Sequence, residues 1–196
     1  MASAGTDNDL FALYLEGDCE AFRELFHRHS RGLFSFAYRM LGEPPLAEEV
    51  VQEAFTRVVR SPPDLGRGTK FSTFLYSVCR NLCIDEVRKR RVRRHAPLND
   101  PSGQGDGRSL EERIAHEGPP TDAPAMNREI GHRIEEALAE LPDEQKEVFL
   151  LREFSEMPFA EVARTVGCSE NTAKSRMRYA LERLRVLLGD LDPEER

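Results

Sequence analysis

The feature that most constrains the fold is a segment near the middle of the chain that cannot form a core. Residues 97–125 read PLNDPSGQGDGRSLEERIAHEGPPTDAPA and are rich in Gly, Pro, Ser and Asp. Such a composition buries too little apolar surface to offset the conformational entropy that is lost on folding. We therefore expect two small helical domains joined by a flexible, acidic linker over residues 96–126.

On both sides of this linker the chain predicts helices, because apolar residues recur at i, i+3 and i+4 and no segment alternates long enough for a sheet. The expected fold class is all-α. The first domain is expected over residues 1–95, the second over 127–190, and a short tail over 191–196. In the first domain, Asp18 is the expected N-cap of a helix that reaches Met40. Gly42, Pro44 and Pro45 should end that helix before the next one, Leu46–Val59.

The longest helical stretch runs from Phe71 to at least Ala96 without Gly or Pro. Phe71, Leu75, Val78 and Leu82 fall on one face and should pack inward. A second stripe carries Ser77, Asn81, Asp85 and Arg88, and six cations lie between Arg88 and Arg94. Phe74 and Tyr76 add aromatic rings.

Rings, an amide and a run of cations suit an unstacked, single-stranded nucleic acid, because bases stack on rings and cations track phosphates. The competing interpretation is a solvated basic helix end above an ordinary core. The charge distribution bears on this choice. The chain carries −7 overall, but residues 70–94 hold eight basic and two acidic residues, or +6, which leaves −13 elsewhere. This asymmetry argues against indiscriminate DNA coating and for a localised site.

Several classes of protein are disfavoured. No apolar run approaches the ~18 residues of a membrane span, and the N-terminus is polar and acidic, so we expect a cytoplasmic protein without membrane insertion. The four cysteines form no CxxC motif. They are expected to be free thiols, and a role for the Cys79 and Cys83 pair is left open. No metal-ligand or nucleophile spacing occurs, since His27 and His29 point to different helix faces. We expect no enzyme, no metal and no cofactor.

The second domain contains the pattern of a helix-turn-helix. Pro142 should lie in the first turn of the helix that follows a helix over Arg128–Leu141. The residues of that earlier helix expected to be buried are Ile130, Ile134, Ala137, Leu138 and Leu141. Phe159–Val166 is then a short helix, Gly167 a turn, and Ser169 the N-cap of a longer helix that reaches Leu188. Its outward side chains suit major-groove edges and are Asn171, Lys174, Ser175 and Arg178. The alternative here is a plain helical hairpin.

The two halves, in this order, resemble a bacterial RNA polymerase sigma factor of the sigma-70 family, in its extracytoplasmic-function (ECF) group. The first half carries the Val-Gln-Glu-x-Phe signature at residues 51–55 and Arg-Asn-x-x-x-Asp at residues 80–85, similar to region 2. The second carries Thr-x-Lys-Ser-Arg at residues 172–176, similar to region 4. The resemblance covers residues 9–95 and 127–188. It implies promoter-specific initiation together with core RNA polymerase.

The resemblance also implies roles for particular residues. The helix over residues 46–60 would dock on the clamp helices of the polymerase β′ subunit through Glu48, Glu49, Gln52 and Glu53. The loop over residues 61–70 and the helix after it would capture the melted −10 strand, with a flipped base read by the loop backbone and by Asn81. The full set for the −10 element is Lys70, Tyr76, Arg80, Asn81, Asp85, Arg88 and Arg91.

Region 4 would bind the −35 duplex through Asn171, Thr172, Lys174, Ser175, Arg176 and Arg178. Further implied partners are the polymerase β flap and an anti-sigma factor. The alternative function is a helix-turn-helix regulator, or a sigma mimic that titrates an anti-sigma factor. A mimic would need neither the cationic run at Arg88–Arg94 nor the outward Lys174 and Arg178.

Overall fold

The computed structural model describes residues 5–66, 68–95 and 125–189, without the side chains of residues 91–95 and 125–128. These residues form eight helices and no strand, as the all-α prediction requires. The chain divides into two compact units, residues 1–116 and 117–196. The division falls within the segment predicted as a linker, of which residues 96–124 lie outside the described ones.

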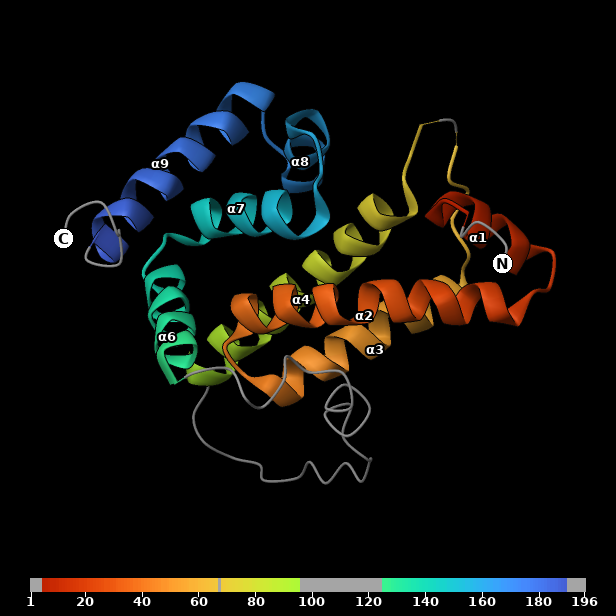
Figure 1. The fold of residues 1–196 in the computed structure, drawn as a ribbon, viewed down its shortest axis with the longest axis horizontal. Helices are drawn as coiled ribbons and strands as arrows, with labels where there is room; N and C mark the ends of the chain where they lie inside the picture. The colour runs from red at the N-terminus through yellow and green to blue at the C-terminus, as the bar shows by residue number, and fades with distance from the viewer. Residues whose placement is uncertain (1–4, 67, 96–124, 190–196) are drawn as a thin grey trace. The chain divides into compact units, whose positions relative to one another are not determined.

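The first unit contains α1 (Asp7–Leu15), α2 (Cys19–Leu41), α3 (Pro44–Arg60) and α4 (Phe71–His95). Helices α2, α3 and α4 pack against one another, and α1 lies across the N-terminal half of α2 beside the loop that joins α3 to α4 (Figure 1). Aromatic side chains fill the region where these elements meet. The rings of Phe11 and Phe71 lie 5.1 Å apart, and those of Phe26 and Phe55 lie 4.7 Å apart.

Local capping explains where α2 begins and ends. The Asp18 carboxylate accepts hydrogen bonds from the backbone N–H groups of Glu20 and Ala21, at 2.9 and 3.3 Å. Gly42 takes the left-handed conformation, with φ 76°, and its N–H donates to the Tyr38 carbonyl. The prediction that Pro44 and Pro45 only terminate a helix was wrong. They open α3, because a proline in the first turn loses no intrahelical hydrogen bond.

Two further features of the first unit differ from the expectation. Helix α1 was not predicted; a capping box in which Thr6 and Asp9 exchange hydrogen bonds starts it. The buried face of α4 is also rotated around the helix axis relative to the predicted face. Phe71 and Leu75 are buried as expected, whereas Val78 and Leu82 are half-buried and the remaining core positions are Tyr76, Cys79 and Cys83.

The second unit contains α6 (Ala125–Ala139), α7 (Asp143–Ser155), α8 (Phe159–Val166) and α9 (Glu170–Leu188). Helix α9 packs against the other three, and α8 and α9 form the predicted helix-turn-helix (Figure 1). Gly167 makes the turn with φ 74°, and the Ser169 hydroxyl accepts a hydrogen bond from the Thr172 N–H at 3.1 Å. Helix α6 begins at Ala125, two residues before the predicted start of this domain.

Some predicted positions in the second unit were wrong. Ile130 and Ile134 were expected in the core, but each is 37% exposed. The other three predicted positions are confirmed, because Ala137 and Leu138 of α6 are buried and so is Leu141 just after the helix. Pro142 is the N-cap that precedes α7, rather than a first-turn residue, and Pro158 is the N-cap of α8. Across the described ranges, every helix is too short or too polar to span a bilayer.

Candidate nucleic-acid interface

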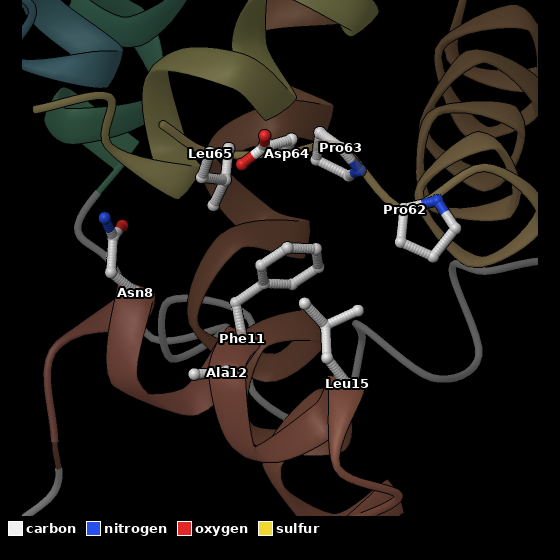
Figure 2. Close-up of a pocket in the computed structure, with 8 residues that line it drawn as sticks. All are labelled: Asn8, Phe11, Ala12, Leu15, Pro62, Pro63, Asp64 and Leu65. Carbon is white, nitrogen blue, oxygen red and sulfur yellow. The ribbon is translucent and has the colours of Figure 1, made fainter. Parts of the chain in front are cut away.

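The loop before α4 and helix α1 enclose a pocket of about 490 Å³. Figure 2 shows Phe11 and Leu15 of α1 on one side of it, with Pro62 and Pro63 of the loop opposite. Asn8 lies at the edge of this pocket. Its side-chain nitrogen donates to the Thr69 carbonyl at 2.9 Å, and its oxygen accepts from the Phe71 N–H at 2.8 Å. The end of the loop and the start of α4 are thus held by a side chain from a distant helix.

The stripe predicted to face the opened strand is largely accessible. Lys70, Asn81, Asp85 and Arg88 are exposed, and Arg80 is half-buried. The Arg80 guanidinium donates to the Asn81 side-chain oxygen at 3.0 Å. Because that bond uses the amide oxygen, it restricts how the Asn81 amide can present itself to a base. The structure therefore brings a cation, an amide and a carboxylate together on one side of α4.

Tyr76 is buried and does not belong to this exposed stripe, so its assignment to the −10 site stays a prediction that the described conformation does not favour. The side chain is 3% exposed, and its ring meets the edge of the Phe36 ring at 5.7 Å. Burial raises the pKa of its hydroxyl. The space for the hydroxyl exists because α2 has a glycine there, since a Cβ on Gly32 would lie 2.5 Å from the Tyr76 oxygen. Five residues separate Tyr76 from Asn81, so the two side chains fall on different faces of the helix.

The cationic run at the end of α4 serves more than one purpose. Arg88 and Lys89 are exposed. Arg90 turns back to α2, where it donates to the Leu41 carbonyl at 3.3 Å and pairs with Glu43 at 2.9 Å. A cation at a helix C-terminus satisfies a free carbonyl there, so Arg90 stabilises the end of α2. The side chain of Arg91 lies outside the described residues.

The residues predicted to contact the polymerase adjoin the predicted DNA stripe. A groove of about 580 Å³ between α3 and α4 is lined by Glu49 and Glu53 on one side and by Asp85 and Arg88 on the other. Gln52 is exposed, and Glu48 is half-buried. Glu53 pairs with Arg57 one turn along α3 at 2.9 Å. The sequence assigned these side chains to two surfaces, and the structure places members of both in one groove.

Cys79 and Cys83 are both fully buried on the inward face of α4. A hydrogen bond with Cys83, together with burial, raises the pKa of the Cys79 thiol well above its usual value. Both residues are free thiols. Because buried cysteines are inaccessible to reactants, we infer that Cys79 and Cys83 serve in packing.

The predicted −35 residues on α9 divide into two groups. Asn171, Thr172, Lys174, Ser175 and Arg178 are exposed. Lys174 pairs with Glu170 at 2.6 Å, and the Arg178 guanidinium lies 4.9 Å from the centre of the Tyr179 ring. Exposed pairs of this kind contribute at most ~1 kcal/mol, so they can be exchanged for phosphate contacts at little cost.

Arg176 differs from its neighbours. Its guanidinium pairs with the Glu144 carboxylate of α7, and its side chain is only 22% exposed. It points away from the face that carries Lys174, because two residues along a helix rotate the side chain by roughly 200°. Its assignment to the DNA-reading face stays a prediction, which this ion pair does not favour. Arg176 joins α9 to α7.

Two residues that position the candidate reading elements could not be recognised from the sequence. Asn8 holds the loop before α4, as described above. Arg152 supports the turn between α7 and α8, where Glu156 takes a left-handed φ of 53°. It donates to the Met157 carbonyl at 2.6 Å, and its guanidinium lies 5.3 Å from the centre of the Phe159 ring. Both contacts depend on loop geometry, which helical periodicity does not reveal.

Comparison with known proteins bears on both units. Residues 25–93 match the family Sigma-70 region 2, and residues 131–184 match Sigma-70, region 4. The chain is 32% identical over 170 residues to the ECF RNA polymerase sigma factor SigL of Mycobacterium tuberculosis, covering 86% of this chain and 89% of SigL. It is 28% identical over 176 residues to the ECF RNA polymerase sigma factor SigW of Bacillus subtilis, covering 90% and 93%.

Solved structures share the fold. CnrH in its complex with the cytosolic domain of CnrY superposes with a TM-score of 0.65 at 21% identity, covering 96% of this chain and 99% of that chain. The sigma factor RpoE of Bartonella quintana, solved with the anti-sigma factor NepR, gives 0.62 at 20% identity, covering 86% and 96%. The matched regions and the near-complete alignment with SigL show that this chain belongs to the ECF group of sigma-70 family RNA polymerase sigma factors.

Proposed function

We propose that this sigma factor binds core RNA polymerase and directs initiation by holding two promoter elements with its two units. The first would capture the opened −10 strand with α4 and the loop over residues 61–70. The second would read the −35 duplex with α9. One observation supports this proposal: each unit carries an exposed stripe of polar side chains. The stripe of the first unit contains the Asn81 amide and the Arg88 cation, and that of the second contains the cations Lys174 and Arg178.

The −10 stripe suits an opened strand. A flipped base presents its Watson–Crick edge, which an amide such as Asn81 can read, and its phosphates meet Arg80 and Arg88. The α9 face suits a duplex, because the N-terminal half of a recognition helix enters the major groove. There Lys174 and Arg178 supply donors for base edges or phosphates.

Glu49, Gln52 and Glu53 are proposed to contact the β′ clamp helices, with the β flap engaging the second unit. An anti-sigma factor is a further proposed partner, since a similar fold was solved with NepR. In this role the protein works in the cytoplasm with the polymerase and catalyses no reaction of its own.

A run-off transcription assay with purified core polymerase tests the proposal. The protein should support initiation at promoters drawn from its own genome, and failure at every such promoter would refute it. A pull-down with core polymerase separates the alternatives, because a stand-alone helix-turn-helix regulator or a mimic that only titrates an anti-sigma factor would not be retained.

Asn81→Ala tests the division of labour between the units. Loss of the amide should weaken opening at −10, measured by permanganate footprinting, more than it weakens −35 duplex binding, measured by gel shift. Equal losses in both measurements would contradict the assignment of Asn81 to the opened strand.

A further inference from the structure

We propose that Asn8 of α1 is a positioning residue for promoter opening, which it supports by clamping the end of the −10 loop to the start of α4. This inference rests on the proposed function of the loop. Asn8 is far from the loop in sequence and belongs to a helix that lies outside the matched region 2 segment. Its contribution is therefore visible only in the folded unit.

The clamp has two points, one on each side of Lys70. The Asn8 nitrogen donates to the Thr69 carbonyl at 2.9 Å, and the Phe71 N–H donates to the Asn8 oxygen at 2.8 Å. The two bonds fix the orientation of the amide, because the reverse orientation would set donor against donor and acceptor against acceptor. Lys70, an exposed residue assigned to the −10 element, is held between them.

The bond from the Phe71 N–H to the Asn8 oxygen also replaces a missing helix cap. The first N–H groups of a helix have no partner within the helix, and a Ser, Thr, Asp or Asn side chain just before it usually accepts from them. Lys70 stands before α4 and has no acceptor. Asn8 accepts from Phe71, the first residue of α4, and so supplies the cap from another helix.

Helix α1 is itself firmly held, which a clamp requires. Asp7 pairs with His29 at 2.7 Å and with Arg28 at 3.2 Å, both on α2. Phe11 is 2% exposed and packs against the Phe71 ring. Asn8 lies between these two anchors, so its amide is presented from a fixed frame. The loop, by contrast, has exposed residues at 61, 62, 64, 66 and 68–70.

The test compares Asn8→Leu with the wild-type full chain, at a promoter that the wild-type protein opens with core polymerase. Leucine has the same number and branching of side-chain heavy atoms, carries no charge and makes neither hydrogen bond. We expect backbone amides in residues 64–70 of the free protein to exchange hydrogen about fivefold faster, and opening at −10 to fall by a similar factor. Binding to a −35 duplex should be unchanged.

Asp18→Ala is the matched control. It removes a cap from the same unit, at the start of α2, without touching the loop. It should lower the stability of the first unit as Asn8→Leu does, while loop exchange and −10 opening stay at the wild-type level. Equal opening defects in the two variants, or wild-type opening in Asn8→Leu, would overturn the proposal.

Asn8→Asp separates the two hydrogen bonds. The carboxylate still accepts from the Phe71 N–H but cannot donate to the Thr69 carbonyl. The first turn of α4 should remain protected from exchange while residues 64–70 exchange faster, and wild-type protection of the loop would contradict the clamp. Exchange is measured without DNA, so the added negative charge cannot affect the result by repelling phosphates. If the wild-type protein itself opens no promoter, the proposed function fails instead, and the exchange result still reports on the clamp.

Discussion

On the proposed reading face of α9, the cap and the ion pairs of the outward side chains lie within one helix, whereas the −10 stripe depends on contacts among four separate elements. On α9, Ser169 caps the start, and Lys174 and Arg178 pair within the same helix. On the first unit, Asn8 of α1 holds the loop, Gly32 of α2 makes room for Tyr76, and Arg90 returns to the end of α2. Substitutions on neighbouring helices should therefore disrupt the −10 stripe more readily than the −35 face.

The largest effect is expected from Phe71→Ala. Phe71 is fully buried against Phe11, and truncating a buried Phe typically costs ~3–5 kcal/mol. Hydrogen exchange should increase throughout α1–α4, and −10 opening should be lost while −35 duplex binding persists. Leu150→Ala in the core of the second unit is the reciprocal control and should give the opposite pattern. Loss of both activities in each variant would show that the units are energetically coupled.

Gly32→Ala should have a smaller effect that is also confined to the first unit. The new methyl group would meet the buried Tyr76 oxygen, and overpacking costs ~1–3 kcal/mol, while alanine regains up to ~1 kcal/mol of helix propensity. We expect a net loss of about 1–2 kcal/mol in the free energy of unfolding of this unit. Tyr76→Phe removes the oxygen, so Gly32→Ala in that background should be neutral or stabilising. A persistent loss there would contradict the assigned contact.

A third comparison uses two cations on α9. Lys174→Ala should weaken −35 binding and lower the salt slope by about one if the side chain meets a phosphate. Arg176→Ala removes an ion pair with Glu144, worth at most ~1 kcal/mol of stability, and should leave the salt slope unchanged. Gel shifts across a salt series measure both. A lower salt slope of −35 binding in Arg176→Ala would indicate that Arg176 contacts a phosphate and belongs to the DNA-reading face.

The smallest functional effect is expected at the cysteines. Cys19 is exposed, whereas Cys79 and Cys83 are buried, and the pKa of Cys79 is raised. At pH 8 a thiol-alkylating reagent should modify Cys19 in the native protein without loss of transcription, and should reach Cys79 and Cys83 only after denaturation. Mass spectrometry of the modified peptides measures this. Rapid native labelling of Cys83 would show that α4 opens more readily than its packing indicates.

The all-α class, the helix-turn-helix and most helix boundaries could be predicted from the amino-acid sequence. They follow from periodicity and from caps such as Asp18, Gly42 and Ser169. It also indicated the outward positions of Asn81, Lys174 and Arg178, since helical spacing orders residues around one axis. The structure alone decided which face of α4 is buried, that Tyr76 and Arg176 serve packing and an ion pair, and that Asn8 reaches Thr69 and Phe71. These contacts depend on how neighbouring helices pack. The contacts of Asn8 join residues 61 or more positions apart, and such contacts produce no periodic pattern in the sequence.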